Sequence, residues 1–148
     1  MPKHHETRKL PYTADQMFTL VADVEQYPKF IPWISAARIR SKRPTATGEM
    51  LEADLIISFK VFRERFGSRV ELDREDRRID TEYVDGPFRH MNSIWRFRDR
   101  DEGGCEVTFD VDFEFRNRIL GSAAQMFFYD AMKRIVRAFE RRAAELYG

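Results

Sequence analysis

The sequence predicts an α+β fold in which a curved antiparallel sheet grips one long C-terminal helix. Two changes of hydrophobic period carry this prediction. Between about residues 35 and 116, apolar and polar residues alternate with a period of two, which is typical of strands with one covered and one wet face. Over residues 118–147 the period becomes helical, and only this helix is long enough to cover the dry face of the sheet.

Two short elements precede the alternating region. Residues 4–11 predict a short strand. Thr13 and Gln16 form a candidate capping box, in which the hydroxyl accepts a backbone N–H and the amide three residues later reaches back, so we expect a helix after Thr13. Each proline within residues 27–33 removes a backbone donor, so this segment predicts one or two helical turns with exposed or half-buried rings.

About six strands fill the alternating region, and the last of them is the clearest. Its two faces separate apolar side chains from polar ones. The apolar face carries Cys105, Val107, Phe109, Val111, Phe113 and Phe115. Turn signals at residues 47–48, 85–87 and 102–104 separate strands. In the strand around residues 62–72, Glu64 and Ser68 interrupt the inward row, and they need partners, water or a ligand head group unless Glu64 reaches solvent at the strand end.

The C-terminal helix carries one apolar stripe with small residues along its centre. The stripe comprises Leu120, Ala124, Phe127, Phe128, Ala131, Ile135, Ala138, Phe139 and Leu146. Alanine recurs every seven residues in this stripe, flanked by rings. Two interpretations stay open: the alanines let helix and sheet approach closely, or they leave a tunnel for an elongated apolar molecule.

Composition limits the class of protein. The 148 residues, 43% hydrophobic and 34% charged, fit one globular domain spanning residues 1–148. The 26 Lys+Arg against 25 Asp+Glu give a net charge of +1, so we expect no DNA partner. The single cysteine excludes an internal disulfide framework, and no apolar run is long enough to span a bilayer. We expect a cytoplasmic protein, at most peripheral to the inner membrane.

Signatures of catalysis and metal binding are missing from the sequence. It has no Gly-rich phosphate loop, nucleophile elbow or paired-cysteine spacing. His4 and His5 point to opposite faces of a strand and are poorly placed to share an ion. Cys105 is expected to be a buried, inert thiol. The acidic row Asp110, Asp112 and Glu114 is better explained by a solvated face with cross-strand pairs than by acid/base catalysis. We expect no catalytic residue, no metal and no cofactor apart from a bound ligand.

Three segments resemble a known family. They are similar to motifs of the coenzyme-Q-binding, Coq10-like START-domain proteins, within the polyketide cyclase and lipid transport superfamily: residues 21–33, residues 85–91 followed by residues 95–97, and residues 105–117. The resemblance covers nearly the whole chain in the right order. It implies a helix-grip (START/Bet v 1-like) fold, with a seven-stranded antiparallel sheet wrapped around the C-terminal helix and a lipid cavity between them.

The same resemblance implies more than one function. One branch of the family binds ubiquinone, a bacterial branch is a ribosome-association toxin, and the wider superfamily includes polyketide cyclases and dehydrases. We expect a non-enzymatic protein that holds ubiquinone or a similar isoprenoid lipid between sheet and helix and supports respiration or quinone delivery. The alternative is a toxin-like protein that binds the large ribosomal subunit and blocks subunit association.

The expected lipid site combines both lines of reasoning. The resemblance contributes Trp33, Phe66, Ser68, Pro87, Phe88 and Arg89. The predicted facing of side chains contributes Trp95, Phe127, Ala131 and Ile135. Arg89, or Glu64 with Ser68, is expected to orient the polar quinone ring.

The ribosome-binding alternative uses outward cations to contact phosphates. These are Arg38, Arg40, Lys42, Arg63, Arg65 and Arg69. Their ordinary interpretation is a solvated sheet face that acidic neighbours neutralise, which the net charge of +1 favours.

Overall fold

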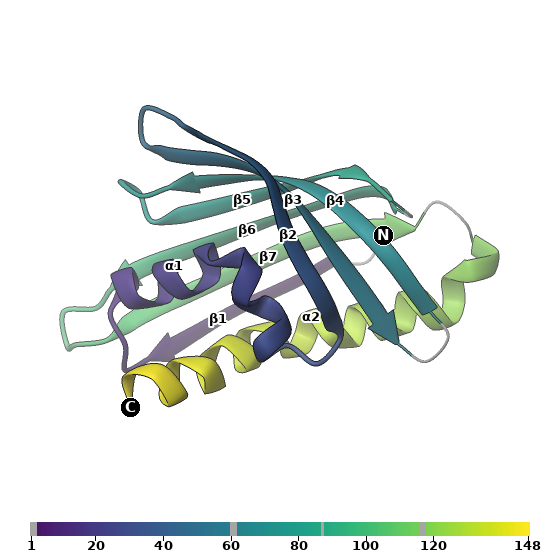
Figure 1. Cartoon of the computed structure of the whole chain (residues 1–148). Helices are drawn as coiled ribbons and strands as arrows, with labels where there is room; N and C mark the ends of the chain where they lie inside the picture. The colour runs from purple at the N-terminus through teal and green to yellow at the C-terminus, as the bar shows by residue number, and fades with distance from the viewer. Residues whose placement is uncertain (1–2, 60–61, 87, 116–117) are drawn as a thin grey trace.

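A computed structural model describes residues 3–59, 62–86, 88–115 and 118–148 (Figure 1). Seven strands, two α-helices and one 3-10 helix make up these residues. In chain order they are β1 (Lys3–Leu10), α1 (Ala14–Ala22), the 3-10 helix η1 (Val24–Lys29), β2 (Ile34–Pro44), β3 (Gly48–Phe59), β4 (Phe62–Asp73), β5 (Arg78–Asp85), β6 (Phe88–Asp99), β7 (Cys105–Phe115) and α2 (Arg118–Tyr147).

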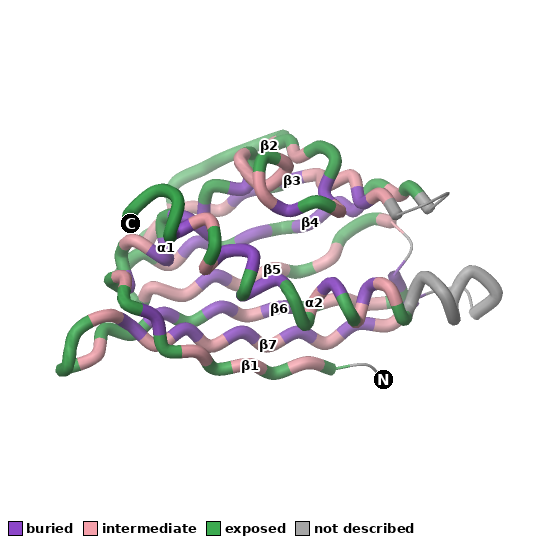
Figure 2. The backbone as a smooth tube through the Cα atoms, turned by 90° about the horizontal axis from the view of Figure 1, so that it is seen from below, coloured by how far each residue is buried: buried purple, intermediate pink, exposed green. Residues whose placement is uncertain are grey.

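The strands form one antiparallel sheet in the order β1-β7-β6-β5-β4-β3-β2. Each strand pairs with the next along the chain, except that β1 pairs with β7, so that Leu10 lies opposite Cys105. Both α-helices lie on the same face of the sheet (Figures 1 and 2). α2 packs most closely against β1, β7 and α1. The predicted seven-stranded antiparallel sheet around a C-terminal helix is confirmed.

The N-terminal elements follow the local rules of the sequence. Thr13 caps α1: its Oγ1 accepts the Gln16 N–H at 3.0 Å, and its own N–H donates to Gln16 Oε1 at 2.9 Å. η1 contains Pro28, and the Tyr27 hydroxyl donates a hydrogen bond to the Val21 carbonyl. These bonds hold η1 against the end of α1, close to α2.

The outer face of β7 is a row of cross-strand pairs, as predicted. Its inward residues are all buried, while the residues between them are half-exposed. Asp110 pairs with His5 of β1, and Asp112 pairs with His90 of β6 at 3.2 Å. The row is therefore a paired, solvated surface.

The buried stripe of α2 differs in part from the predicted one. Its buried members are Phe128, Ala131, Ile135, Val136, Ala138, Phe139 and Ala143. Leu146 was expected in the stripe, but it is 51% exposed; in this last turn of α2, Tyr147 contacts Tyr12 at a ring distance of 6.1 Å. The side chains of Leu120 and Ala124 lie outside the described residues.

Candidate functional site

A cavity of about 110 Å³ lies between α2 and the inner face of the sheet. Side chains from η1, from every strand between β2 and β7 and from α2 enclose it. Its lining comprises Tyr27, Trp33, Ile34, Leu55, Ile57, Phe66, Ser68, Thr81, Met91, Ser93, Trp95, Phe109, Val111, Phe128, Met132, Ile135 and Phe139. None of these described lining residues carries an acidic or basic side chain.

Aromatic rings close one side of this cavity. Trp95 packs against Phe109 at a ring-centroid distance of 4.4 Å and against Phe139 at 5.3 Å. Phe139 in turn contacts Tyr27 at 5.2 Å. Ring pairs with these tilted and edge-on geometries add to the stability that burial gives. They fix α2 and η1 to the sheet at this end of the cavity.

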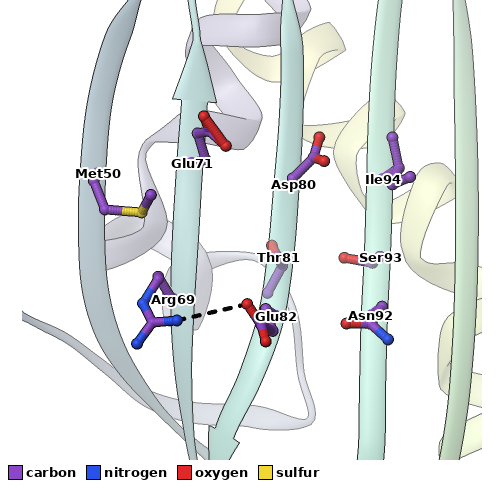
Figure 3. Close-up of a pocket in the computed structure, with 9 residues that line it drawn as sticks. All are labelled: Met50, Arg69, Glu71, Asp80, Thr81, Glu82, Asn92, Ser93 and Ile94. Atoms are coloured by element: carbon purple, nitrogen blue, oxygen red, sulfur yellow. Dashed lines mark ion pairs between the residues drawn. The ribbon is translucent and has the colours of Figure 1, made fainter. Parts of the chain in front are cut away.

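Polar groups in the cavity are few and neutral. Ser68 and Ser93 are only 5% and 9% exposed, and Thr81 is half-buried directly opposite Ser93 across the β5–β6 pair. Thr81 and Ser93 also border a groove on the outer face of the sheet, where Figure 3 shows them side by side on neighbouring strands. The Nε1 of Trp33 is buried and has no hydrogen-bond partner among the described residues. Burial raises the pKa of Tyr27, and the negative charge of the nearby Asp23 raises it further. The phenol therefore stays protonated at neutral pH.

Half of the predicted site residues line the cavity. They are Trp33, Phe66, Ser68, Trp95 and Ile135. Glu64, which was expected to act with Ser68, is partly exposed and does not line the cavity.

Two other predicted residues lie on β6, and neither of them lines the cavity. Phe88 is fully buried beside it, in a cluster of rings that includes Phe66 at 4.7 Å and Phe128 at 4.9 Å. Arg89 points the other way: its side chain is 69% exposed and its Nε lies 3.6 Å from Glu114 Oε1. Neighbouring residues on a strand face opposite sides, so an inward Phe88 places Arg89 on the outer face.

The remaining predicted residues lie on α2 or outside the described chain. Phe127 is half-buried, and its neighbour Phe128 lines the cavity instead. Ala131 and Ala138 are 3% and 1% exposed, but neither lines the cavity, which favours close packing over a tunnel at these two positions. Pro87 lies outside the described residues.

Sequence reasoning missed several lining residues. Thr81 and Ser93 were missed because, in a sequence, a polar residue that faces inward cannot be told from the polar residues that face solvent. The inward row Ile79, Thr81, Tyr83 on β5 contained the signal, since its register places Thr81 on the same face as the buried Ile79. Met132 was missed because the helical stripe was centred on the alanines.

The histidines, the cysteine and the acidic residues do not gather into a metal-binding cluster in the described part of the chain. No cluster of three or more His, Cys, Asp or Glu side chains is found there. His4 faces the ring of Phe109, whereas His5 pairs with Asp110, so the two histidines point to opposite faces as predicted. Cys105 is fully buried, and burial, with a smaller effect of Asp99, raises the pKa of its thiol to about 11.

The outer cations of the sheet are mostly paired. Arg40 lies 3.2 Å from Asp54, and Arg65 lies 3.0 Å from the same carboxylate. Two more ion pairs complete the row, between Lys42 and Glu49 at 2.9 Å and between Arg69 and Glu82 at 3.6 Å. The pair of Arg69 and Glu82 lies in the groove that Figure 3 shows. Arg38 and Arg63 are exposed and form no ion pair with the described residues.

A seven-stranded antiparallel sheet around a long C-terminal helix, with an apolar cavity between them, defines the START-like helix-grip class of proteins. The chain belongs to the polyketide cyclase / dehydrase and lipid transport family, whose model matches residues 10–140. No helix among the described residues is long and apolar enough to cross a membrane.

Relatives of this chain carry two kinds of name. The ribosome association toxin RatA of Escherichia coli K12 is 34% identical over 148 residues, which cover 100% of this chain and 90% of the toxin. The mitochondrial coenzyme Q-binding protein COQ10 homolog B of Xenopus laevis is 30% identical over 150 residues, covering 99% of this chain and 59% of that protein. The solution structure of an 18 kDa protein from Caulobacter crescentus matches with a TM-score of 0.80 at 36% identity, over 100% of this chain and 99% of that one.

Proposed function

We propose that this protein is a non-enzymatic carrier that holds ubiquinone or a similar isoprenoid quinone between the sheet and α2. The observation that carries the proposal is the cavity itself: it is lined by rings and aliphatic side chains, with a few neutral polar groups. The relative named for coenzyme Q binding supports the same ligand class.

The charge of the lining selects among lipids. An ionised carboxylate or phosphate buried without a counter-charge is strongly disfavoured. No lysine, arginine or histidine lines the described cavity, so a fatty acid or phospholipid head group would find no partner there. A quinone is neutral and brings no such cost.

The same lining argues against acid/base catalysis. Cyclase and dehydrase chemistry needs a group that exchanges a proton near neutral pH. The titratable side chain in the described lining is Tyr27, and burial raises the pKa of its phenol while its hydroxyl is bonded to the Val21 carbonyl. We therefore infer binding rather than turnover, with the quinone as bound ligand and no other cofactor.

The size of the cavity limits what it holds in this conformation. Its volume of about 110 Å³ is well below the roughly 300–1,000 Å³ of common small-molecule sites. A long prenyl chain therefore requires the walls to separate. Burial of apolar surface provides the driving force, at about 0.8 kcal/mol for each CH₂, or about 4 kcal/mol for a five-carbon prenyl unit.

This function implies a cellular setting. A quinone carrier collects and releases its ligand at the membrane that contains it, so we propose a cytoplasmic protein in peripheral contact with the inner membrane. There it would support respiration by quinone delivery.

Intrinsic fluorescence offers a direct test. The chain contains two tryptophans, Trp33 and Trp95, and both line the cavity. Titration with a short-chain ubiquinone should quench their emission to saturation at one ligand per protein, whereas palmitate should not compete. Mass spectrometry of lipids extracted from protein purified from its native host should find a quinone. Absence of quenching together with a quinone-free extract would reject the proposal.

Ribosome binding is the second candidate, and the name of the 34% identical relative favours it. Binding to ribosomal RNA would act through phosphate contacts and weaken steeply with salt. Arg38 and Arg63 are the cations to test first, because both are exposed without a described acidic partner. Arg38→Glu/Arg63→Glu should abolish cosedimentation with ribosomal subunits and leave quinone quenching intact. Wild-type protein that fails to cosediment at low salt removes this candidate.

A further inference from the structure

We propose that Ser68, Thr81, Ser93 and the indole N–H of Trp33 form a head-group subsite that binds carbonyl oxygens of the ligand. This inference rests on the proposed function, because it names the polar end of the same ligand. It goes further by assigning the recognition of oxygen to particular atoms.

The three hydroxyls form one patch on the floor of the cavity. Thr81 lies directly opposite Ser93, and Ser68 lies diagonally from Thr81, because Val70 on β4 is the direct partner of Thr81. Direct partners in a sheet have Cβ atoms about 4.5–5.5 Å apart, and diagonal neighbours about 7–8 Å. Thr81 and Ser93 are therefore close enough to share one carbonyl oxygen of a ligand, whereas Ser68 would meet a second oxygen of the same ligand.

These groups have no hydrogen-bond partner for their side chains in the described part of the protein. Within the described residues, the side chains of Ser68, Thr81 and Ser93 form no hydrogen bond, although Ser68 and Ser93 are at least nine-tenths buried. The Trp33 N–H is buried and equally unpartnered. Buried polar groups are normally satisfied, so the open N–H of Trp33 and the two buried serines around a single cavity indicate a ligand that completes them, with the half-buried Thr81 beside them.

The chemistry of the four groups defines that ligand. An indole N–H can only donate a hydrogen bond, so the atom it meets must be an acceptor. Hydroxyls can donate as well, and no charged group lines the described cavity. Trp33 precedes β2, an edge strand, whereas the hydroxyls lie on β4, β5 and β6, so the donors come from separate parts of the cavity lining. A neutral ring with two carbonyl oxygens matches this arrangement, and a plain hydrocarbon does not.

A matched pair of ligands separates oxygen recognition from apolar burial. Decylubiquinone and decylbenzene share an alkyl chain, but only the first carries carbonyl groups. In Ser68→Ala/Ser93→Ala, the dissociation constant for decylubiquinone should rise by about tenfold or more, and that for decylbenzene should not change. Trp95 reports binding in each protein, including Trp33→Phe, which should weaken decylubiquinone alone.

Two further variants serve as second test and control. Thr81→Val keeps the shape of the side chain and removes one hydroxyl, so it tests the subsite even where the double variant fails to fold. Thr108→Val makes the same change on the outer side of β7, where it should alter neither ligand.

The outcomes distinguish the two proposals. Wild-type protein that binds decylubiquinone, with variants that bind it equally well, overturns the head-group subsite and leaves the carrier function standing. Variants that lose both ligands equally also overturn it, because the hydroxyls would then only shape the cavity. Wild-type protein that binds neither ligand rejects the carrier function, and the subsite with it.

Discussion

Two adjacent residues on α2 provide a sharp test of where the cavity lies. Ala131 is 3% exposed and does not line the cavity, whereas Met132 is partly exposed and lines it. Ala131→Trp forces an indole into a close-packed interface, which costs about 1–3 kcal/mol or more in the free energy of unfolding. At about 2–4 °C per kcal/mol for a chain of this size, Tm should fall by about 2–12 °C.

Met132→Trp places the same ring beside about 110 Å³ of free space. Its free energy of unfolding should change by less than about 1 kcal/mol, while quinone affinity should fall by about tenfold or more as the ring fills the cavity. Urea denaturation and fluorescence titration of both variants give the two quantities. Wild-type stability in Ala131→Trp combined with lost binding would show that the alanine row borders the ligand, and the placement of the cavity would be wrong.

Three further predictions concern single positions. Phe88→Ala removes a fully buried ring that contacts five others, and it should cost about 3–5 kcal/mol in urea denaturation. The Cys105 thiol should resist a disulfide reagent in the native state. Burial raises its pKa to about 11, so the contribution of the protonated thiol to stability is complete below the pKa of the unfolded chain and is lost as pH rises toward 11. Unfolding midpoints of wild type and Cys105→Ala, measured as a function of pH, should show this loss. Gly48→Ala would place a Cβ 1.8 Å from the Leu72 carbonyl oxygen, so its free energy of unfolding should fall by more than about 1 kcal/mol.

The alternating pattern predicted the strands and their faces well, because a sheet covered on one side converts burial directly into a period of two. The turn between β4 and β5 was not predicted. Residues 74–77 contain neither glycine nor proline; instead Asp73 Oδ1 accepts the Asp76 N–H at 3.0 Å, and Arg77 adopts a left-handed conformation with φ of 51°. Such a turn depends on one side chain and one unusual backbone angle, which composition does not reveal.

Site residues could be predicted from the sequence only where the pattern within a single strand or helix determines which way a side chain faces. Phe66 and Trp95 could be placed from their inward rows. Choosing between Phe127 and Phe128 requires the exact rotation of α2, which a broad apolar stripe does not define. The meeting of Thr81 with Ser93 depends on the register between β5 and β6, and a single sequence contains no direct record of register.

The pairing of β1 with β7 has a consequence for how the protein is made. Lys3 lies opposite Asp112 and Leu10 opposite Cys105, so nearly the whole sheet must be synthesised before this edge can close. Closing so long a loop is entropically unfavourable, and contacts of this kind slow folding to roughly milliseconds to seconds. α2 packs most closely on these two strands and follows β7 in the chain. During synthesis, the part of the ring-rich inner face that α2 covers therefore stays exposed until α2 leaves the ribosome, and in that interval the nascent chain is most prone to aggregation and most dependent on chaperones.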